Sequence, residues 1–393
     1  MLQRPSASLF TRHFALVFAI TFITFFAAFQ LFPTVPLRLI QLGATVAQSG
    51  RFMSVFTLGS ACGALFTGPL GDRIGQRRMI VGSTLIFTSI LFLYGFIQGP
   101  WWWFCILALP HGVVWSGLLT ATMATLGGVL PEDRRADGLT LFGLASPGGA
   151  VFGPLLGLAI FQRWGFMVIT FSLGITFLAL TLLAFTLPLD QAKGERRSPF
   201  QVPERIMLGP CSVLFATALG YGVLGTYTAQ EALNLKLGMP SAFLTFMAVG
   251  MVGMRVVMTR RGFDANPMKQ LPAMLWMTFA GLLILAAAPT GLARHIVSAL
   301  LYGAGYSMVH TLVNTYVLNV VHPERRGAAF GATLFSFDIG IGLGAFTIGG
   351  FIGWADGRFG PLGFRLGWGI SALMALVAVP LAYRLVNQAK TNT

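Results

Sequence analysis

GPLGDRIGQRR, residues 68–78, is a short polar segment between two long apolar stretches of the chain. The stretches cover about residues 46–70 and 79–98. Each is long enough for a membrane-spanning helix, which needs about 20 apolar residues. Three arginines, Arg73, Arg77 and Arg78, lie in this segment. We interpret the segment as a tight turn that joins two transmembrane helices at one membrane surface.

The alternation of apolar stretches and short polar segments continues along the whole chain. Of the 393 residues, 55% are hydrophobic and 10% are charged, whereas a soluble domain carries about 25% charged residues. The pattern predicts an all-α membrane protein with twelve transmembrane helices and short loops. The expected spans are residues 13–33, 46–70, 79–98, 102–129, 139–161, 167–188, 207–229, 241–259, 270–289, 295–321, 328–352 and 365–386.

The basic residues indicate how the helices are oriented. Most of the 26 Lys and Arg residues fall in segments on the same side of the membrane as the N-terminus. Cytoplasmic loops carry such an excess of Lys and Arg. We therefore expect a multi-pass protein of the bacterial inner membrane with both termini in the cytoplasm. Because this distribution also accounts for the net charge of +14, no nucleic-acid partner is expected.

The chain is expected to consist of two related halves. The predicted domains are an N-terminal six-helix half, residues 1–189, a charged cytoplasmic linker, residues 190–206, and a C-terminal six-helix half, residues 207–393. Duplicated halves around a central site are a common plan of transporters. Three pairs of residues lie 191 positions apart, close to half the chain: Arg134 and Arg325, Gly149 and Gly340, and Gly153 and Gly344.

The segment 68–78 resembles the cytoplasmic signature loop of major facilitator transporters. The residues that carry the resemblance are Gly68, Gly71, Asp72, Arg73, Gly75, Arg77 and Arg78. The resemblance implies the major facilitator fold, with two pseudo-symmetric six-helix halves. It also implies a loop that latches the halves in one state. Asp72 can accept hydrogen bonds from a neighbouring helix N-terminus, where the helix dipole favours an anion. The alternative is a basic loop that only orients the protein.

The fifth expected span contains a row of small residues. Gly149, Gly153 and Gly157 lie on one face of a helix, and Pro154 removes one backbone hydrogen bond. The pattern resembles the signature of the facilitator-type antiporters that export drugs or metabolites in exchange for protons. The alternative is a face of small residues that serves helix packing alone.

The fourth expected span departs from the exporter pattern. Exporters of this type commonly carry an arginine four residues before a Gln-Gly pair, whereas this chain has Ala108 and the pair His111-Gly112. The His-Gly pair, Arg255 and the segment 335–338 (FSFD) are similar to a bacterial subgroup that includes exporters of staphylopine-type opine metallophores. We therefore do not expect this chain to use the arginine-based coupling mechanism of those exporters.

Ionisable residues inside a membrane span are functional candidates, because burying a charge in lipid is costly. Asp338 lies well inside the eleventh span. It is expected either to bind and release a proton, since burial disfavours the charged form, or to pair with a cation on a neighbouring helix. Arg255, in the eighth span, could pair with Asp338, bind an anionic substrate or extend to the membrane surface.

Three further polar features occur within spans or at the end of one. The tenth span contains a stripe of polar residues at helical spacing, which is expected to line a cavity or face a partner helix. The stripe consists of Tyr302, Tyr306, His310 and Asn314. His111 shares a helix face with Trp115 and is either part of the site or a structural residue bonded to the backbone. Glu231 lies at the outer end of the seventh span, where a solvated helix end is favoured over the mouth of a cavity.

These observations predict a secondary active transporter that exports a small organic molecule by alternating access and proton antiport. The substrate is expected to be a drug-like compound, a metabolite or a metallophore. The alternatives are an importer or uniporter of a metabolite or a metal, including copper, and a membrane sensor without transport. No enzyme motif or metal-ligand cluster occurs in the sequence. We expect no cofactor and no bound metal, the proton gradient as energy source, and a monomer in contact with bilayer lipid.

Overall fold

The computed structural model describes residues 11–131, 138, 141–188, 205–261, 267–321 and 326–391. Within them the chain forms twelve long α-helices, which confirms the expected all-α fold. The first six are α1 (Arg12–Gln41), α3 (Arg51–Ile74), α4 (Gln76–Phe96), α5 (Trp102–Val129), α7 (Ala145–Trp164) and α8 (Phe166–Ala184). The second six are α9 (Leu208–Asn234), α10 (Ala242–Arg261), α11 (Leu271–Ala287), α12 (Leu292–Val320), α13 (Arg326–Phe359) and α14 (Leu362–Thr391). Three short elements precede helices: α2 (Val46–Ser49), η2 (Arg205–Met207) and η3 (Pro267–Gln270).

Eleven of the long helices are long and apolar enough to cross a membrane, and α10 has a shorter apolar part, Ala242–Met258. The expected ends were wrong at several places. α1 does not end at residue 33 but runs through Pro33 and Pro36 to Gln41. Prolines are tolerated in membrane helices because neighbouring groups satisfy the freed backbone carbonyls. In α13 and α14 the helices also extend several residues beyond the expected spans.

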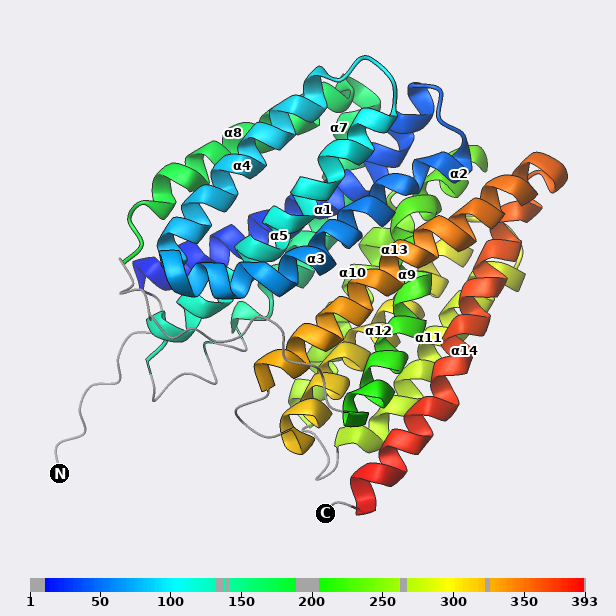
Figure 1. Ribbon diagram of the computed structural model, residues 1–393. Helices are drawn as coiled ribbons and strands as arrows, with labels where there is room; N and C mark the ends of the chain where they lie inside the picture. Colours follow the sequence, from blue (N-terminus) through cyan, green and yellow to red (C-terminus); the bar gives the residue numbers. More distant parts are fainter. Residues whose placement is uncertain are drawn as a thin grey trace.

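The helices form two bundles, α1 to α8 and α9 to α14, which lie side by side in Figure 1. We call the end where α1 begins and α14 ends the proximal end, and the opposite end the distal end. Because successive long helices alternate in direction, α3 and α13 run antiparallel, and α3 begins at the distal end. Most of the expected linker, residues 190–206, lies outside the described residues, which resume at Arg205.

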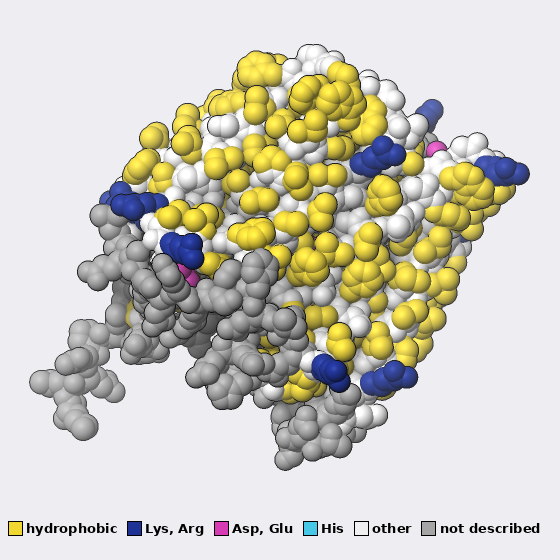
Figure 2. Space-filling view, viewed as in Figure 1, with side chains coloured by type: hydrophobic (Ala, Val, Ile, Leu, Met, Phe, Trp, Pro, Cys, Tyr) yellow, Lys and Arg dark blue, Asp and Glu magenta, His cyan; other side chains and the backbone are white. Residues whose placement is uncertain are grey.

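The surface is that of a protein surrounded by lipid. Figure 2 shows a face covered largely by hydrophobic side chains, with Lys and Arg near the two ends of the helices. Ile175 and Leu182 of α8 are 62% and 65% exposed. Such exposure is unfavourable in water but not in a bilayer, where the solvent is itself apolar. The apolar belt fits the expectation of a multi-pass membrane protein.

Glycines bring helices of each bundle into backbone contact. In the first bundle, a Cβ atom on Gly112 of α5 would collide with the carbonyl oxygen of Phe56 in α3. In the second bundle, a Cβ atom on Gly303 of α12 would collide with the carbonyl oxygen of Met247 in α10. Gly112 and Gly303 lie 191 positions apart, the offset expected from the sequence. The two halves therefore use the same packing at corresponding positions.

Replacing Gly303 with leucine is expected to destabilise the protein. The added side chain has no space against α10, and overpacking of this kind costs about 1–3 kcal/mol. Thermal unfolding of the purified protein in detergent measures the effect. Gly253→Leu in α10 is the matched control, because nothing lies within 4 Å of a Cβ atom at Gly253. Equal stability of the two variants would contradict the packing described here.

Candidate functional site

Asp338 lies at the contact between the two bundles. Its side chain is 6% exposed, and its Oδ2 atom accepts a hydrogen bond of 2.7 Å from the Oγ atom of Ser60 in α3. Ser60 is 2% exposed. Within the described part of the chain, Asp338 forms no ion pair. The observed partner is therefore a hydroxyl group of the other bundle. Ser60 could not be singled out from its sequence context, because serines are common in tightly packed membrane helices.

The tyrosine and histidine stripe of α12 faces α9 and α13. The ring of Tyr306 stacks on Tyr302 and on Tyr221 of α9, with ring centroids 5.2 Å and 4.9 Å apart. The His310 ring lies 5.4 Å from the ring of Phe337, the neighbour of Asp338 in α13. The stripe and Asp338 are thus brought together through Phe337.

Two hydroxyl groups of this stripe are buried without a hydrogen-bond partner among the described residues. They belong to Tyr302, which is 0% exposed, and Tyr306, which is 6% exposed. Farther along α12, the Nδ2 atom of Asn314 lies 3.0 Å from the Nδ1 atom of His310. Buried polar groups that lack a protein partner are positions where water or a ligand can bind. The stripe therefore offers stacking surfaces and hydrogen-bonding groups in one place.

Arg255 of α10 connects the two bundles near the proximal end, at the start of α7. Its Nη1 atom donates a hydrogen bond of 3.0 Å to the carbonyl oxygen of Gly143, which precedes α7. The pairing with Asp338 considered from the sequence does not occur within the described residues. Arg255 thus holds the proximal part of α10 against the start of α7.

His111 is enclosed within the first bundle. The side chain is 3% exposed, and its Nδ1 atom lies 3.3 Å from the hydroxyl oxygen of Tyr94. The rings of Phe56 and Phe87 flank it, with centroids 4.9 Å and 4.7 Å away. Trp115, one turn later, is 9% exposed. The partner of His111 is thus a tyrosine hydroxyl rather than the backbone carbonyl considered from the sequence.

Replacing His111 with phenylalanine is expected to leave transport close to the wild-type rate. All the described contacts of His111 are with its own bundle, so its loss removes one buried hydrogen bond, at a cost of about 1 kcal/mol in stability. Transport and thermal unfolding are measured on the same preparation. A variant that folds normally but no longer transports would place His111 in the transport mechanism instead.

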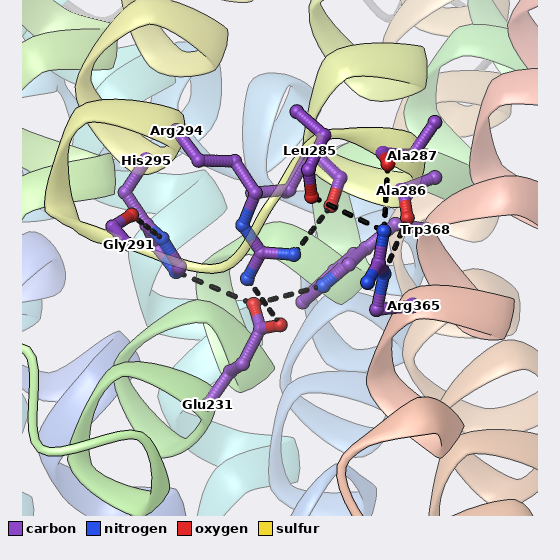
Figure 3. A network of polar contacts seen from close by, with 10 residues as sticks. Glu231, Leu285, Ala286, Ala287, Gly291, Arg294, His295, Arg365 and Trp368 are labelled. Atoms are coloured by element: carbon purple, nitrogen blue, oxygen red, sulfur yellow. Dashed lines mark hydrogen bonds and ion pairs between the residues drawn. The ribbon is translucent and has the colours of Figure 1, made fainter.

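Glu231 forms a buried polar network at the distal end of the second bundle (Figure 3). It is 1% exposed, so the expectation of a solvated helix end was wrong. Its Oε1 atom lies 2.6 Å from the Nη2 atom of Arg294, and its Oε2 atom lies 3.3 Å from the Nε2 atom of His295. Trp368 of α14 donates a hydrogen bond of 2.9 Å to Oε2. These three partners from α12 and α14 cover the carboxylate and exclude water.

The same network holds the end of α11. Arg294 donates a hydrogen bond of 2.9 Å to the carbonyl oxygen of Leu285. Arg365 of α14 donates to the carbonyl oxygens of Ala286, Ala287 and Ala288, at 2.8, 2.7 and 3.1 Å. The last carbonyls of a helix have no partner within the helix, so the two arginines supply it. Arg294 was expected in a loop before α12, but α12 begins at Leu292 and places this side chain in the interior.

The row of glycines in α7 packs against α1. Cβ atoms at Gly149 and Gly153 would come within 2.8 and 2.9 Å of the carbonyl oxygens of Phe22 and Phe26. A Cβ atom at Gly157 would lie 2.8 Å from the Cα atom of Gln30. Pro154 is buried in the same helix. The row thus forms a close contact between two helices of the first bundle.

The segment 68–78 forms the tight turn expected from its sequence. α3 ends at Ile74, and Gly75 has a φ of +92°, which favours glycine. Asp72 is exposed and accepts a hydrogen bond of 3.1 Å from the side chain of Gln76, in the first turn of α4. The guanidinium of Arg77 lies 6.0 Å from the centre of the Phe185 ring. These contacts stay within the first bundle, whose loop also includes Gly68, Gly71, Arg73 and Arg78.

The sequence profile of the Major Facilitator Superfamily matches residues 17–345, which is most of the chain. The chain belongs to this superfamily. Among curated members, it is 23% identical to the staphylopine export protein of Staphylococcus aureus, over 86% of this chain and 88% of that protein. It is 24% identical to the gentisate transporter of Corynebacterium glutamicum, over 86% of this chain and 80% of that protein. The chain is therefore a membrane transporter and not an enzyme.

A solved major facilitator structure supports the fold. A bacterial homologue of the human lysosomal transporter Spinster, in an inward-facing and unoccupied conformation, superposes with a TM-score of 0.75. The match covers 98% of both chains at 13% sequence identity. This likeness confirms the major facilitator fold with two six-helix halves.

Sequence reasoning on this major facilitator protein missed four residues that the structure places in buried polar contacts: Ser60, Arg294, His295 and Trp368. Arg294 and His295 are two adjacent basic residues at the start of an apolar helix. Such a pair is a signal for a buried partner, because charged groups in a membrane interior are almost always paired.

Proposed function

We propose that this major facilitator protein exports a small organic molecule in exchange for protons. The membrane is the bacterial inner membrane, the proximal end faces the cytoplasm and the distal end faces outward. The excess of basic residues on the side of the termini supports this orientation. The similarity to an export protein along most of both chains supports the direction of transport.

The position of Asp338 carries the proposal of proton coupling. In the described part of the chain, it is the one carboxyl group that accepts a hydrogen bond from the opposite bundle. A titratable group at that contact can make the relative position of the bundles depend on protonation. The two bundles then alternate between conformations open to either side of the membrane. Protonation of Asp338 drives the return of the empty transporter to the cytoplasmic side.

The stripe of α12 supports an aromatic or unsaturated organic substrate. Tyr221 and Tyr306 present stacked rings, and stacked aromatic pairs contribute about 0.5–1.5 kcal/mol beyond the buried area. The hydroxyl groups of Tyr302 and Tyr306, together with Asn314 and His310, are available as hydrogen-bonding groups for substrate. Sites for small molecules usually combine such aromatic walls with a few polar groups.

Proton exchange is tested in everted membrane vesicles that contain the protein. A pH gradient, acid inside, is first established by respiration and followed with a fluorescent amine. Addition of a transported compound from a panel of drugs, metabolites and opine metallophores is expected to collapse part of the gradient. Vesicles without the protein provide the control. If radiolabelled substrate accumulates while the gradient is unaffected, proton antiport is excluded.

A second candidate is the transport of an aromatic acid without a proton gradient. The similarity to the gentisate transporter favours it, and Arg255 provides a cation within the membrane domain for a carboxylate. Counterflow separates the two functions. Vesicles preloaded with unlabelled gentisate are expected to take up labelled gentisate without a pH gradient if the second candidate is correct. An exporter driven by protons accumulates its substrate only while the gradient is present.

A further inference from the structure

Two arginines contact the loop between α4 and α5 at the distal end of the first bundle. Arg38, in the last turn of α1, donates hydrogen bonds to the Oε1 atom of Gln98 at 2.9 Å and to the carbonyl oxygen of Ile97 at 3.4 Å. The guanidinium of Arg51, the first residue of α3, lies 5.5 Å from the centre of the Trp101 ring. The loop therefore has one guanidinium group at its start and another at its end.

The positive charges of these two arginines are not balanced by acidic side chains. Within the described residues, neither Arg38 nor Arg51 forms an ion pair. The distal connections of the first bundle are residues 42–50, residues 97–101 and Gly165, and none of them contains Asp or Glu. This end of the first bundle therefore carries an excess of positive charge.

The second bundle uses its distal arginines differently. Arg294 is 4% exposed and pairs with Glu231, and Arg365 donates hydrogen bonds to the carbonyl oxygens at the end of α11. Both therefore have acceptors within the protein. Arg51, in contrast, is exposed and has no hydrogen-bond acceptor among the described residues. Its N–H groups are available to a partner from outside the chain.

Tryptophans continue this positive surface toward the lipid. Trp102 and Trp103, at the start of α5, are 43% and 45% exposed, and their ring centroids lie 4.6 Å apart. Tryptophan is enriched at the membrane–water interface, where its ring lies at the level of the lipid headgroups. We call the surface formed by Arg38, Arg51 and residues 101–103 the distal rim. The exposed tryptophans place the distal rim at the depth of the phosphates of one leaflet.

The chemistry of the distal rim fits an anionic headgroup. A guanidinium group presents its N–H donors in a rigid fork that matches the oxygens of a phosphate. The contact of Arg51 with the face of an aromatic ring uses no acceptor oxygen. Arg38 adds a second positive charge beside the same loop. A lipid phosphate therefore supplies the charge and the acceptor oxygens that the chain itself does not provide here.

We propose that the distal rim is a binding site for an anionic phospholipid. The phosphate binds at Arg51, and the upper part of the acyl chains packs against Trp102 and Trp103. The bound lipid anchors the loop between α4 and α5 to one leaflet of the bilayer. The inference does not depend on the substrate, the direction of transport or the coupling ion, because no residue of the distal rim belongs to the proposed transport site.

Binding is measured by quenching of tryptophan fluorescence. The purified full-length protein in a neutral detergent is titrated with phosphatidylglycerol that carries brominated acyl chains. A parallel titration uses equally brominated phosphatidylcholine, which has no net charge. Phosphatidylglycerol is expected to reach half-maximal quenching at the lower concentration, and equal curves for the two lipids overturn the proposal. Replacing both Trp102 and Trp103 with phenylalanine is expected to remove the additional quenching by phosphatidylglycerol. If that quenching is retained, the lipid binds elsewhere.

Replacing Arg51 with glutamine is expected to weaken binding of phosphatidylglycerol about fivefold, the effect of one basic residue near an anionic lipid surface. Binding of phosphatidylcholine is expected to be unchanged. Arg163→Gln is the matched control, because Arg163 is also an exposed distal arginine and lies 5.1 Å from the centre of a tryptophan ring, that of Trp164. It is expected to bind as the parent does. No weakening in Arg51→Gln, or equal weakening in both variants, overturns the proposal.

Two further measurements complete the test. Thermal unfolding without lipid is expected to be the same for Arg51→Gln and the parent, so that a change in quenching reports binding and not folding. Inorganic phosphate, in excess over the lipid, is expected to leave the quenching nearly unchanged, because the acyl chains hold the lipid beside the tryptophans. If phosphate reverses the quenching while chloride at equal ionic strength does not, the ligand is a soluble anion and the lipid proposal is wrong.

Discussion

Replacing Asp338 with asparagine is expected to reduce substrate-dependent proton movement to the level of vesicles without the protein. Asparagine has nearly the same shape and can still accept the hydrogen bond from Ser60, so the contact between α3 and α13 is retained. Its amide does not bind or release a proton near neutral pH. The loss therefore concerns coupling and not folding, and collapse of a pH gradient in everted vesicles measures it.

Two controls define this result. Asp338→Glu retains a carboxyl group and is expected to keep partial proton exchange. Asp356→Asn makes the same change in the same helix near its distal end, away from Ser60, and is expected to exchange protons at the wild-type rate. The assignment fails if Asp338→Asn exchanges protons as the wild type does, or if Asp356→Asn loses exchange to the same extent.

Replacing Arg294 with methionine is expected to lower the free energy of unfolding by about 3–5 kcal/mol, because it leaves a buried carboxylate without its cation. Both oxygens of Glu231 are engaged in the wild type, Oε1 by Arg294 and Oε2 by Trp368 and His295. With Glu231 1% exposed, water cannot replace the lost guanidinium. Unfolding of the purified protein in detergent measures the change.

A double replacement tests whether the unpaired charge causes the loss of stability. Arg294→Met combined with Glu231→Leu removes both charges, and apolar replacement of a buried pair is often neutral in stability. The double variant is therefore expected to be more stable than either single variant. Arg365→Met serves as the matched control, since within the described residues the hydrogen bonds of this partly buried arginine all go to carbonyl oxygens (Figure 3). A double variant as unstable as Arg294→Met would show that the charge is not the cause.

Much of the fold could be predicted from patterns of neighbouring residues in the sequence. The number of helices, the antiparallel order and the 191-residue relation between halves depend on hydropathy and on repeated glycines, which are visible in a single sequence. The close packing of Gly149 and Gly153 was one of two alternatives considered for α7, and it is observed. The role of this row in antiport stays a prediction.

The polar contacts were harder to predict because they join residues far apart in the chain. Glu231 and Arg294 are 63 positions apart, and Ser60 and Asp338 are 278 apart. Hydropathy placed the start of this helix at residue 295, three residues after its observed start at Leu292, so Arg294 was assigned to the loop and its pairing with Glu231 was missed. The end of α1 was misplaced for a different reason, since a proline inside a membrane helix resembles a helix end in sequence. The roles of Asp338, Arg255 and His310 remain predictions for the experiments above.

Three hydrogen bonds join the bundles toward the distal end: from Gln230 to Ser49, from Ser54 to the carbonyl oxygen of Gly342 and from Ser60 to Asp338. This line of contacts, the distal seam, has a consequence that concerns ionic strength. Salt screens interactions between exposed charges, and largely abolishes them beyond a Debye length of about 8 Å at physiological concentration. The described contacts of the seam are hydroxyl, amide and carbonyl groups and closely packed glycines, with a single carboxyl group at the inner end. Such neutral contacts are not screened. The contact between the bundles at the distal end is therefore expected to be equally stable at low and high ionic strength.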